Sequence, residues 1–379
     1  MKFIHIADLH LGKTVNEMNL LKDQEYVLRQ ILEIAKQEKV DGILIAGDVY
    51  DRSIPSAEAV SLFDWFLTNI SKNGMFVFCI GGNHDSGERL DFGKQIFANQ
   101  NVFIEGNFSG KIRIIERKDA YGSVFIHLLP FFKPVQVKAL YPEEKIESYY
   151  DAMKAVLKNH SINQNERNIL VTHQFVIGIE PPECSDSEQE IHVGGSEQIS
   201  YQLFDAFDYT ALGHLHGPQK AGKPEIRYSG SLLKYSFSEE FQKKSAVLVE
   251  IKEKGNLSIQ IKALKPLHDM RTIKGPMKEL LRSEIVNEAD ANDYLRIYLT
   301  DQKELLDPAA KLRNVYPNLM ELVIDKYREI DSCLEKMVEI KQKSPMEMTE
   351  SFLKLMTGEK EERRIAYLRQ LFDEGRQEL

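Results

Sequence analysis

Five short hydrophobic runs in this chain each end on a small cluster of Asp, Asn or His residues. The runs read FIHIADLH, DGILIAGD, MFVFCIGGNHD, ILVTH and ALGHLH. Their ends carry Asp8 and His10; Asp48; Asn83, His84 and Asp85; His173; and His214 and His216. The carboxyl ends of strands in an α/β sheet form the edge where ligands collect, so we expect these side chains to lie close together. Oxygen and imidazole donors gathered in this way are typical of a metal centre.

The types and spacing of these residues favour two cations. Asp8 and His10 are two residues apart, and alternate residues of a strand point to the same side. The same holds for His214 and His216. Carboxylate, amide and imidazole donors without a thiolate suit Mn²⁺, Fe or Zn. Two such ions about 3.5–4 Å apart clamp phosphate oxygens during in-line attack. Asp48 is the natural bridge between them, because a carboxylate can span two ions. The clusters therefore predict a two-metal phosphoester hydrolase.

His84 is the one histidine of the clusters that we treat as a candidate non-ligand. A protonated imidazole beside the scissile phosphate could stabilise developing charge or protonate the leaving oxygen. A nearby carboxylate would orient it, and Asp51 or Asp85 could do so. A single Asp, Asn or His after a strand often forms a turn or caps a helix. The metal site is therefore favoured by the five clusters together and not by any one of them. The other five histidines are expected to serve structure or solvent contact: His5, His127, His160, His192 and His268.

The elements that position these clusters alternate between strands and helices up to about residue 265. Strands are expected over 2–7, 43–46 and 75–80, and helices over 24–38 and between Pro55 and Gly74. The second helix is expected to bury Val60, Phe63, Leu67 and Ile70. Buried strands separated by helices indicate an α/β layered fold. Residues 101–262 are richer in strand patterns, which predicts a second sheet packed against the first.

After Pro266 the pattern predicts a smaller unit of helix, strand, helix and strand, over 277–286, 293–300, 308–315 and 318–325. Two short amphipathic helices are expected from Pro345 onward. We therefore expect three parts: a domain of residues 1–265, a small α+β domain of 266–341 and a helical tail of 342–379. Helices this short are marginal alone in water, so their apolar faces predict docking on a partner. Packing back on their own domain is the alternative.

Composition narrows the class of protein. The chain has 379 residues, 42% of them hydrophobic, and a formal net charge of −9. The charge argues against a protein that coats nucleic acid, but it leaves room for an enzyme whose metal ions neutralise phosphate locally. No apolar run approaches the roughly 20 residues that cross a membrane. Three scattered cysteines form neither a disulfide framework nor a zinc pattern, so a cytoplasmic location is expected.

The motifs DLH, GD-VYDR, GNHD, TH and GHLH, as they stand here, resemble the calcineurin-like metallophosphoesterase superfamily. Longer runs are similar to one branch of it, the nuclease subunits of bacterial SbcCD complexes, which are relatives of the Mre-type break-repair nucleases. These runs are ADLHLGK, GNHDSGERLDFG, VTHQFVIG, SDSE followed by HVGG, GHLHGPQ and IRYSGSLLKYSFSE. The resemblance covers nearly the whole chain and is most specific in the first 240 residues. It implies the metallophosphoesterase fold, with two packed β-sheets flanked by helices.

Carried over residue by residue, the resemblance implies two metal sites, typically filled by manganese. One ion would be held by Asp8, His10, Asp48 and His216, and the other by Asp48, Asn83, His173 and His214. His84 would be the catalytic histidine and Asp51 its orienting partner. Residues 266–341 would be a DNA-capping domain, and the tail would dock on the coiled coil of an SbcC-type ATPase.

The activity implied is an ATP-dependent exonuclease on double-stranded DNA ends, of 3′–5′ polarity, with an endonuclease on single strands and hairpins. It would serve DNA repair, recombination and replication. The ATPase would be the partner, and this chain has no G-x-x-x-x-G-K-[ST] loop of its own. Two copies of each subunit are implied, with a homodimer of the nuclease subunit.

Two other functions are weighed against this one. A protein phosphatase or small-molecule phosphodiesterase would use the same metals, but it has no need of a capping domain. A scaffold with a vestigial site is disfavoured because every expected ligand is present. Four basic residues near the motifs could contact DNA phosphates or simply lie at the surface: Lys13, Arg52, Arg89 and Lys234.

Overall fold

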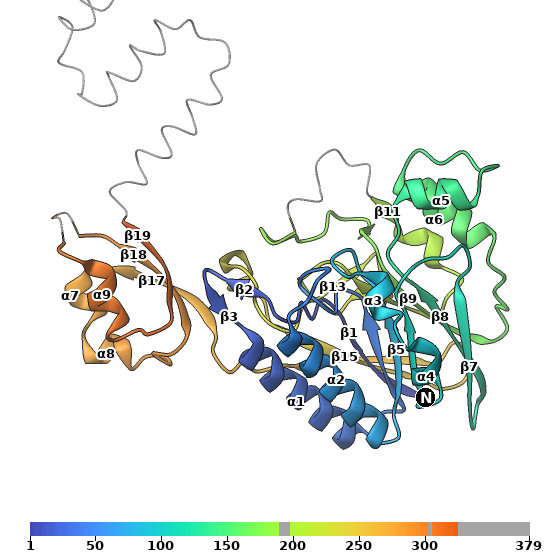
Figure 1. Cartoon of the computed structure of the whole chain (residues 1–379), viewed down its shortest axis with the longest axis horizontal. Helices are drawn as coiled ribbons and strands as arrows, with labels where there is room; N and C mark the ends of the chain where they lie inside the picture. The colour runs from blue at the N-terminus through green and yellow to red at the C-terminus, as the bar shows by residue number, and fades with distance from the viewer. Residues whose placement is uncertain (189–197, 302, 304, 325–379) are drawn as a thin grey trace, which may run out of the picture. The chain divides into compact units, whose positions relative to one another are not determined.

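Two six-stranded sheets form the centre of the larger part of the protein (Figure 1). The computed structural model describes residues 1–188, 198–301, 303 and 305–324. The first sheet has the order β16-β15-β1-β4-β5-β6. Its strands are β1 (Lys2–Ile6), β4 (Gly42–Ala46), β5 (Phe76–Ile80), β6 (Val102–Glu105), β15 (Ser245–Ile251) and β16 (Leu257–Ala263). The second sheet has the order β13-β14-β12-β9-β8-β7. Its strands are β7 (Arg113–Asp119), β8 (Gly122–Leu129), β9 (Arg167–His173), β12 (Tyr209–Gly213), β13 (Gln219–Ala221) and β14 (Lys223–Tyr228).

The middle strands of both sheets run parallel. β1, β4, β5 and β6 are parallel neighbours, and β15 and β16 extend that sheet in antiparallel pairing. In the second sheet β8, β9, β12 and β14 are parallel, with β7 and β13 as antiparallel edges. Parallel neighbours end at the same edge of a sheet, so this topology gathers the carboxyl ends of the strands. The expected α/β class with two packed sheets is confirmed.

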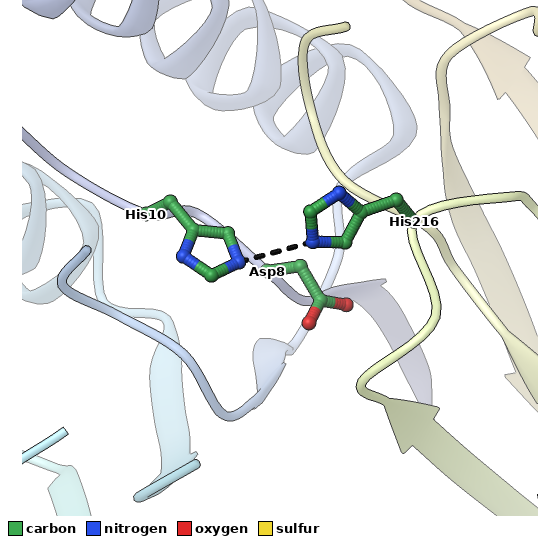
Figure 2. Close-up of side chains that lie close together, drawn as sticks. All are labelled: Asp8, His10 and His216. Carbon is green, nitrogen blue, oxygen red and sulfur yellow. Dashed lines mark hydrogen bonds between the residues drawn. The ribbon is translucent and has the colours of Figure 1, made fainter. Parts of the chain in front are cut away.

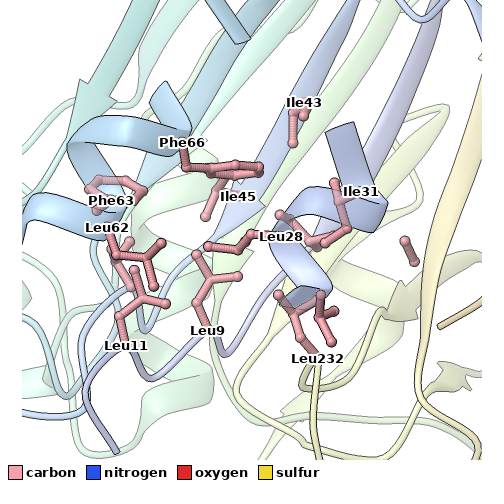
Figure 3. Packing of buried hydrophobic residues seen from close by; sticks show 14 of the residues in the cluster. Leu9, Leu11, Leu28, Ile31, Ile43, Ile45, Leu62, Phe63, Phe66 and Leu232 are labelled. Carbon is pink, nitrogen blue, oxygen red and sulfur yellow. The ribbon is translucent and has the colours of Figure 1, made fainter. Parts of the chain in front are cut away.

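The hydrophobic core has three layers because each sheet is covered on both faces. Between the two sheets lie side chains such as Phe3, Leu44 and Phe78 from the first and Val171 and Ala211 from the second. Helices α1 (Leu21–Glu38) and α2 (Ala57–Lys72) cover the outer face of the first sheet (Figure 3). Helices α5 (Pro134–Leu140) and α6 (Tyr149–Lys158) cover the outer face of the second. Shorter elements complete this part: β2 (Thr14–Val15), β3 (Met18–Asn19), α3 (Gly87–Leu90), α4 (Lys94–Ala98), β10 (Val176–Ile177) and β11 (Ile199–Ser200).

Helix α2 begins where its sequence predicts but buries a slightly different face. The Ser56 hydroxyl caps its start by accepting from the Ala59 amide at 3.2 Å. The buried stripe runs through Phe63, Phe66 and Ile70. Burial of each such side chain stabilises the folded protein by about 1.5–3 kcal/mol. Val60, expected on this stripe, is 44% exposed. The bulky Phe66 turns inward instead, which shifts the buried face away from Val60.

The C-terminal part contains a three-stranded sheet of order β17-β18-β19. Its strands and helices are β17 (Met270–Gly275), α7 (Met277–Leu280), α8 (Ser283–Val286), β18 (Tyr294–Leu299), α9 (Pro308–Arg313) and β19 (Leu319–Ile324). The expected helix over 277–286 is two short helices. The sequence does not predict strand β17. Only Met270 is buried among the residues of this strand, and no alternation of apolar and polar residues marks it.

By their contacts the described residues divide into two units. One comprises 1–272, 287–296 and 316–321, and the other 273–286, 297–315 and 322–324. The boundaries expected at 265 and 341 stay predictions. The tail of 342–379 and His192 lie outside the described residues. Among the residues that are described, no helix combines the length and apolar character needed to span a membrane.

Candidate metal centre

The candidate ligands follow five strands whose carboxyl ends meet at one edge of the two sheets. β1 and β4 are neighbours, and main-chain hydrogen bonds continue beyond them. The Asp8 amide donates to Gly47 at 3.1 Å, and the His10 amide donates to the Asp48 carbonyl at 3.0 Å. In the second sheet, Gly213 pairs with His173 across β12 and β9. These pairings fix the positions of the loops that follow the strands, so residues more than 200 positions apart in the sequence become neighbours.

Four candidate ligands have a backbone conformation that residues other than glycine rarely adopt. The φ angle is +52° at Asp8, +43° at His10, +49° at Asp48 and +107° at His214. Such conformations cost about 1–3 kcal/mol each and persist only where the surroundings enforce them, which happens mostly at functional sites. The strand-end loops are therefore folded to direct these side chains.

The first cluster consists of Asp8, His10 and His216, shown in Figure 2. One ligand atom from each lies within 4.8 Å of the others, and all three residues are buried. The two Nε2 atoms of His10 and His216 are 3.1 Å apart. Two nitrogens bound to one cation at ~2.1 Å, at roughly a right angle, would be about 3 Å apart. The pair therefore fits a shared cation.

The second cluster is centred on the Asn83 side-chain oxygen. This Oδ1 lies 2.9 Å from Nε2 of His173 and 3.1 Å from Nδ1 of His214. The His173 ring is held from behind, because its Nδ1 contacts the Ala46 carbonyl at 2.8 Å. A carbonyl can only accept, so Nδ1 carries a proton, and Nε2 is the nitrogen that would coordinate a cation once its own proton is displaced. One amide oxygen and two imidazole nitrogens thus converge on a second position.

Asp48 lies between the two clusters. Its Oδ2 is 3.7 Å from Nε2 of His10 in the first cluster and 3.3 Å from Nε2 of His173 in the second. The other oxygen, Oδ1, accepts from the main-chain amide of His84 at 2.9 Å. The carboxylate is thus fixed in orientation with one oxygen directed at both clusters. This is the arrangement that a bridging ligand needs.

The surroundings of the buried ligands shift their pKa values and so decide which of them hold protons when no cation is bound. Burial raises the pKa of Asp8 to about 7, and the nearby charge of Asp48 adds to the rise. Burial alone would lower the pKa of His173, but the charge of Asp48 and a hydrogen bond with it raise that pKa to about 9. Burial holds the pKa of His10 well below its usual range, so this ring is neutral and able to coordinate. Bound cations would displace the protons on Asp8 and His173.

His84 stands beside the first cluster, with its ring edge-on to that of His10 at a centroid distance of 4.9 Å. Its Nδ1 contacts the main-chain carbonyl of Asp51 at 3.0 Å. The orienting group is therefore not the expected carboxylate. The Asp51 carboxylate instead accepts a hydrogen bond from the Lys13 ammonium at 2.7 Å. Because the carbonyl accepts, Nδ1 of His84 carries a proton, and Nε2 is the atom left for chemistry.

Asp85, the other candidate partner of His84, holds the backbone of two loops. Its carboxylate accepts from the amides of Val49, Tyr50 and Gly82 at 3.1, 2.9 and 2.9 Å. Burial and the charge of Asp48 raise its pKa to about 6. Gly82 is required here by close approach, because a Cβ at this position would lie 2.2 Å from Oδ1 of Asp48.

Two supporting residues are not among those predicted from the sequence. The Gln24 amide donates to the His10 carbonyl at 2.7 Å and to the Leu9 carbonyl at 3.2 Å, which fixes the loop after β1. The Glu239 carboxylate contacts Nδ1 of His216 at 3.1 Å. Gln24 could have been found as a polar residue on the buried face of its helix, whereas no spacing pattern marks Glu239.

Comparison with known proteins agrees with this geometry. Residues 1–218 match the family model described as calcineurin-like phosphoesterase, and residues 266–357 match the type 5 capsule protein repressor C-terminal domain. The SbcD subunit of the nuclease SbcCD from Staphylococcus epidermidis is 35% identical over 364 residues, which are 95% of this chain and 94% of that protein.

Two solved structures resemble the chain more distantly. A dimetal phosphatase from Danio rerio has a TM-score of 0.41 at 10% identity, covering 69% of this chain and 96% of its own. The protein TT1561 of Thermus thermophilus has a TM-score of 0.39 at 12% identity, covering 69% and 98%. Similarity at this level adds nothing to the assignment. The family match over more than half of the chain and the close relative over nearly all of it are sufficient: this chain is a metal-dependent hydrolase that belongs to the calcineurin-like phosphoesterase family, in the branch of the SbcD nuclease subunits.

Proposed function

We propose that this protein is a two-metal DNA nuclease that processes DNA ends together with an SbcC-type ATPase. The observation that carries the proposal is the position of Asp48, with one carboxylate oxygen directed at two separate donor clusters. A single-ion site has no use for such a shared oxygen. A pair of cations clamping a phosphodiester needs one.

The residues proposed to hold the cations are the seven candidates: Asp8, His10, Asp48 and His216 for one, and Asp48, Asn83, His173 and His214 for the other. When bound, two divalent ions supply Lewis-acid polarisation of the phosphate and a nucleophile at neutral pH. Mn²⁺ is the proposed metal, since oxygen and imidazole donors without thiolate suit it.

His84 is the proposed catalytic residue of the chain. The Asp51 carbonyl fixes its tautomer and ring direction, which leaves Nε2 of the protonated ring as the atom that would donate to a phosphate oxygen or to the leaving oxygen. Asp51 thus serves as the positioning residue through its main chain. Among the basic residues near the motifs, Lys13 and Lys234 have carboxylate partners at 2.7 and 2.8 Å. Arg52 has a longer ion pair, 3.7 Å from its Nε to Oδ2 of Asp51, and a side chain that is 80% exposed, and we propose it as a phosphate contact.

Substrate and partner are proposed from the relative that is named as a component of SbcCD. We expect a 3′–5′ exonuclease on duplex ends and an endonuclease on hairpins and single strands, both strengthened by ATP through the partner. Residues 266–341 would cap the DNA, and the tail would dock on the partner. We also propose a homodimer of this chain within a complex of two subunits each, with Phe92 and Ile96, which are 83% and 71% exposed on one short segment, as candidates for its interface.

The test uses the full chain, with and without the SbcC-type ATPase and ATP, on end-labelled duplex, hairpin DNA and a phosphopeptide in Mn²⁺. We expect DNA cleavage that is strengthened by the partner, and a loss of roughly 10²–10⁴-fold in the His84→Gln variant with metal binding retained. Phosphopeptide turnover without DNA cleavage would favour the phosphatase alternative instead. Undiminished cleavage by the His84 variant would remove its catalytic assignment.

A further inference from the structure

The ligand His216 is held at its main chain and at its ring by residues outside the proposed metal sites. Its main-chain amide donates to the buried carboxylate of Glu188. Its carbonyl accepts from the Lys244 ammonium at 2.9 Å. On the ring, Nε2 faces His10 while Nδ1 faces Glu239 and Ser187 at 3.1 and 2.9 Å. Glu239 and Ser187 therefore contact the ring nitrogen that points away from the proposed cation.

Glu239 is the charged group of this set, and it is fully buried. One of its oxygens contacts Nδ1 of His216, and the other accepts from Lys244 at 2.6 Å and from the Tyr235 amide at 3.2 Å. A buried carboxylate is retained only with such partners, since losing one leaves an uncompensated charge. Lys244 has the partners it needs as well, because it also donates to Ser231 and Gln242 at 2.8 and 2.7 Å.

The contacts decide which nitrogen of His216 carries the proton. The Ser187 hydroxyl donates to Glu239 at 2.8 Å, so it has no proton left for Nδ1. Both groups that face Nδ1 can then only accept from it. The proton therefore lies on Nδ1, and the lone pair of Nε2 points at Asp8 and His10.

We propose that Glu239, anchored by Lys244, is the positioning residue that presents Nε2 of His216 to the cation shared with Asp8 and His10. A carboxylate that accepts from the outer nitrogen of a ligating histidine fixes the ring and increases its basicity. Loss of such a partner weakens metal binding by about 10–100-fold. This inference rests on the proposed metal sites but not on the identity of the substrate.

The run SDSE at residues 185–188 belongs to the same support of His216. Ser187 and Glu188 both contact His216, and the Ser185 amide donates to Glu188 at 3.0 Å. This segment and the segment of Glu239 approach the ligand from separate parts of the chain.

The test measures metal binding by the full chain, by Mn²⁺ titration with electron paramagnetic resonance and by equilibrium dialysis. The wild type is expected to bind two ions. Glu239→Gln is expected to raise the Kd of one ion by about 10–100-fold and to leave the other within about threefold. The Mn²⁺ concentration for half-maximal DNA cleavage should rise by the same factor, with kcat at saturating Mn²⁺ changing far less.

Two controls separate positioning from general destabilisation. Asp119→Asn removes the partner of the buried Arg167, at the end of β9 opposite to His173, and should leave both Kd values unchanged. Ser187→Ala should change them less than Glu239→Gln does. If Glu239→Gln does not fold, the double variant Glu239→Gln/Lys244→Met removes both charges together and carries the same expectation.

Unchanged Kd values in a folded Glu239 variant, or an equal loss in Asp119→Asn, would overturn the inference and leave the proposed function intact. A wild type that does not bind two ions would overturn both.

Discussion

His5 is expected to make the stability of the protein depend on pH, because its imidazole is buried between the two sheets. It lies on β1 and is fully buried. Its Nδ1 contacts the Tyr209 hydroxyl at 2.9 Å and its Nε2 the Leu212 carbonyl at 3.1 Å, both on β12. Burial lowers the pKa of His5 from 6.5 to about 3. The ring is therefore neutral in the folded protein and ties together the two strands that lead to Asp8 and His214.

The sign and size of the effect follow from proton linkage. Below pH 6.5 the unfolded chain binds a proton at His5 and the folded chain does not, so the free energy of unfolding falls as the pH falls towards 3. At pH 5 the difference from pH 7.5 amounts to about 2 kcal/mol. This figure hardly changes if the folded pKa is one unit higher, because both values lie below the pH of the measurement.

The measurement is urea unfolding at pH 7.5 and pH 5.0 with EDTA present, followed by the fluorescence of Trp65, the single tryptophan. His5→Gln retains a donor and an acceptor but cannot titrate, so it should lose about 2 kcal/mol less than the wild type between the two pH values. Tyr209→Phe is the control: it removes one hydrogen bond, at about 1 kcal/mol, and keeps the imidazole and its pH dependence. An equal loss in His5→Gln and the wild type would refute the reasoning.

Two further predictions concern the metal centre. Gly82→Ala would place a Cβ 2.2 Å from Oδ1 of Asp48, so the carboxylate must move, and we expect binding of both ions and DNA cleavage to fall together. Gly275→Ala is the control, because a Cβ there meets only the Leu280 side chain, at an ordinary contact distance of 3.4 Å. Metal binding should also tighten as the pH rises, because His173, with a pKa of about 9, holds a proton that a cation must displace. Between pH 7 and 8.5 the Kd for Mn²⁺ should fall by about tenfold per pH unit, and a Kd that is independent of pH in calorimetric titrations would contradict this.

Most helices and strands of the fold can be predicted from the sequence where their apolar residues form a recognisable pattern. Helix α1 is predictable because its apolar residues recur at the helical period, and the strands β1, β4 and β5 because each is a short, nearly continuous apolar run. Strand β17 lacks that signal, since it is largely half-exposed and joins its sheet through main-chain pairing with β18. The prediction for the face of α2 is wrong at Val60 because several apolar stripes are available, and the packing against α1 and β5 selects among them.

The candidate ligands could be found from the sequence for a topological reason. They follow parallel strands of two packed sheets, and residues at the carboxyl ends of those strands meet once the sheets have formed and packed together. Glu239 carries no comparable mark, because it lies in a short 3-10 helix (Phe237–Glu239) and not at the end of a strand. Residue type and spacing identify groups at the carboxyl ends of strands, but they do not identify groups that come from other parts of the chain.

His84 shows a second limit of prediction from the sequence: the neighbouring residue can be predicted, but not which of its atoms makes the contact. The sequence indicates Asp51 as its neighbour, and Asp51 is in contact, but through its carbonyl oxygen. A carboxylate at that position would add a full negative charge, whereas a carbonyl fixes the same tautomer with a dipole alone. The carboxylate of Asp51 is meanwhile occupied by Lys13. Because every residue has a carbonyl, no pattern of side chains can indicate such a contact, and it is found only where the fold has fixed the course of the backbone.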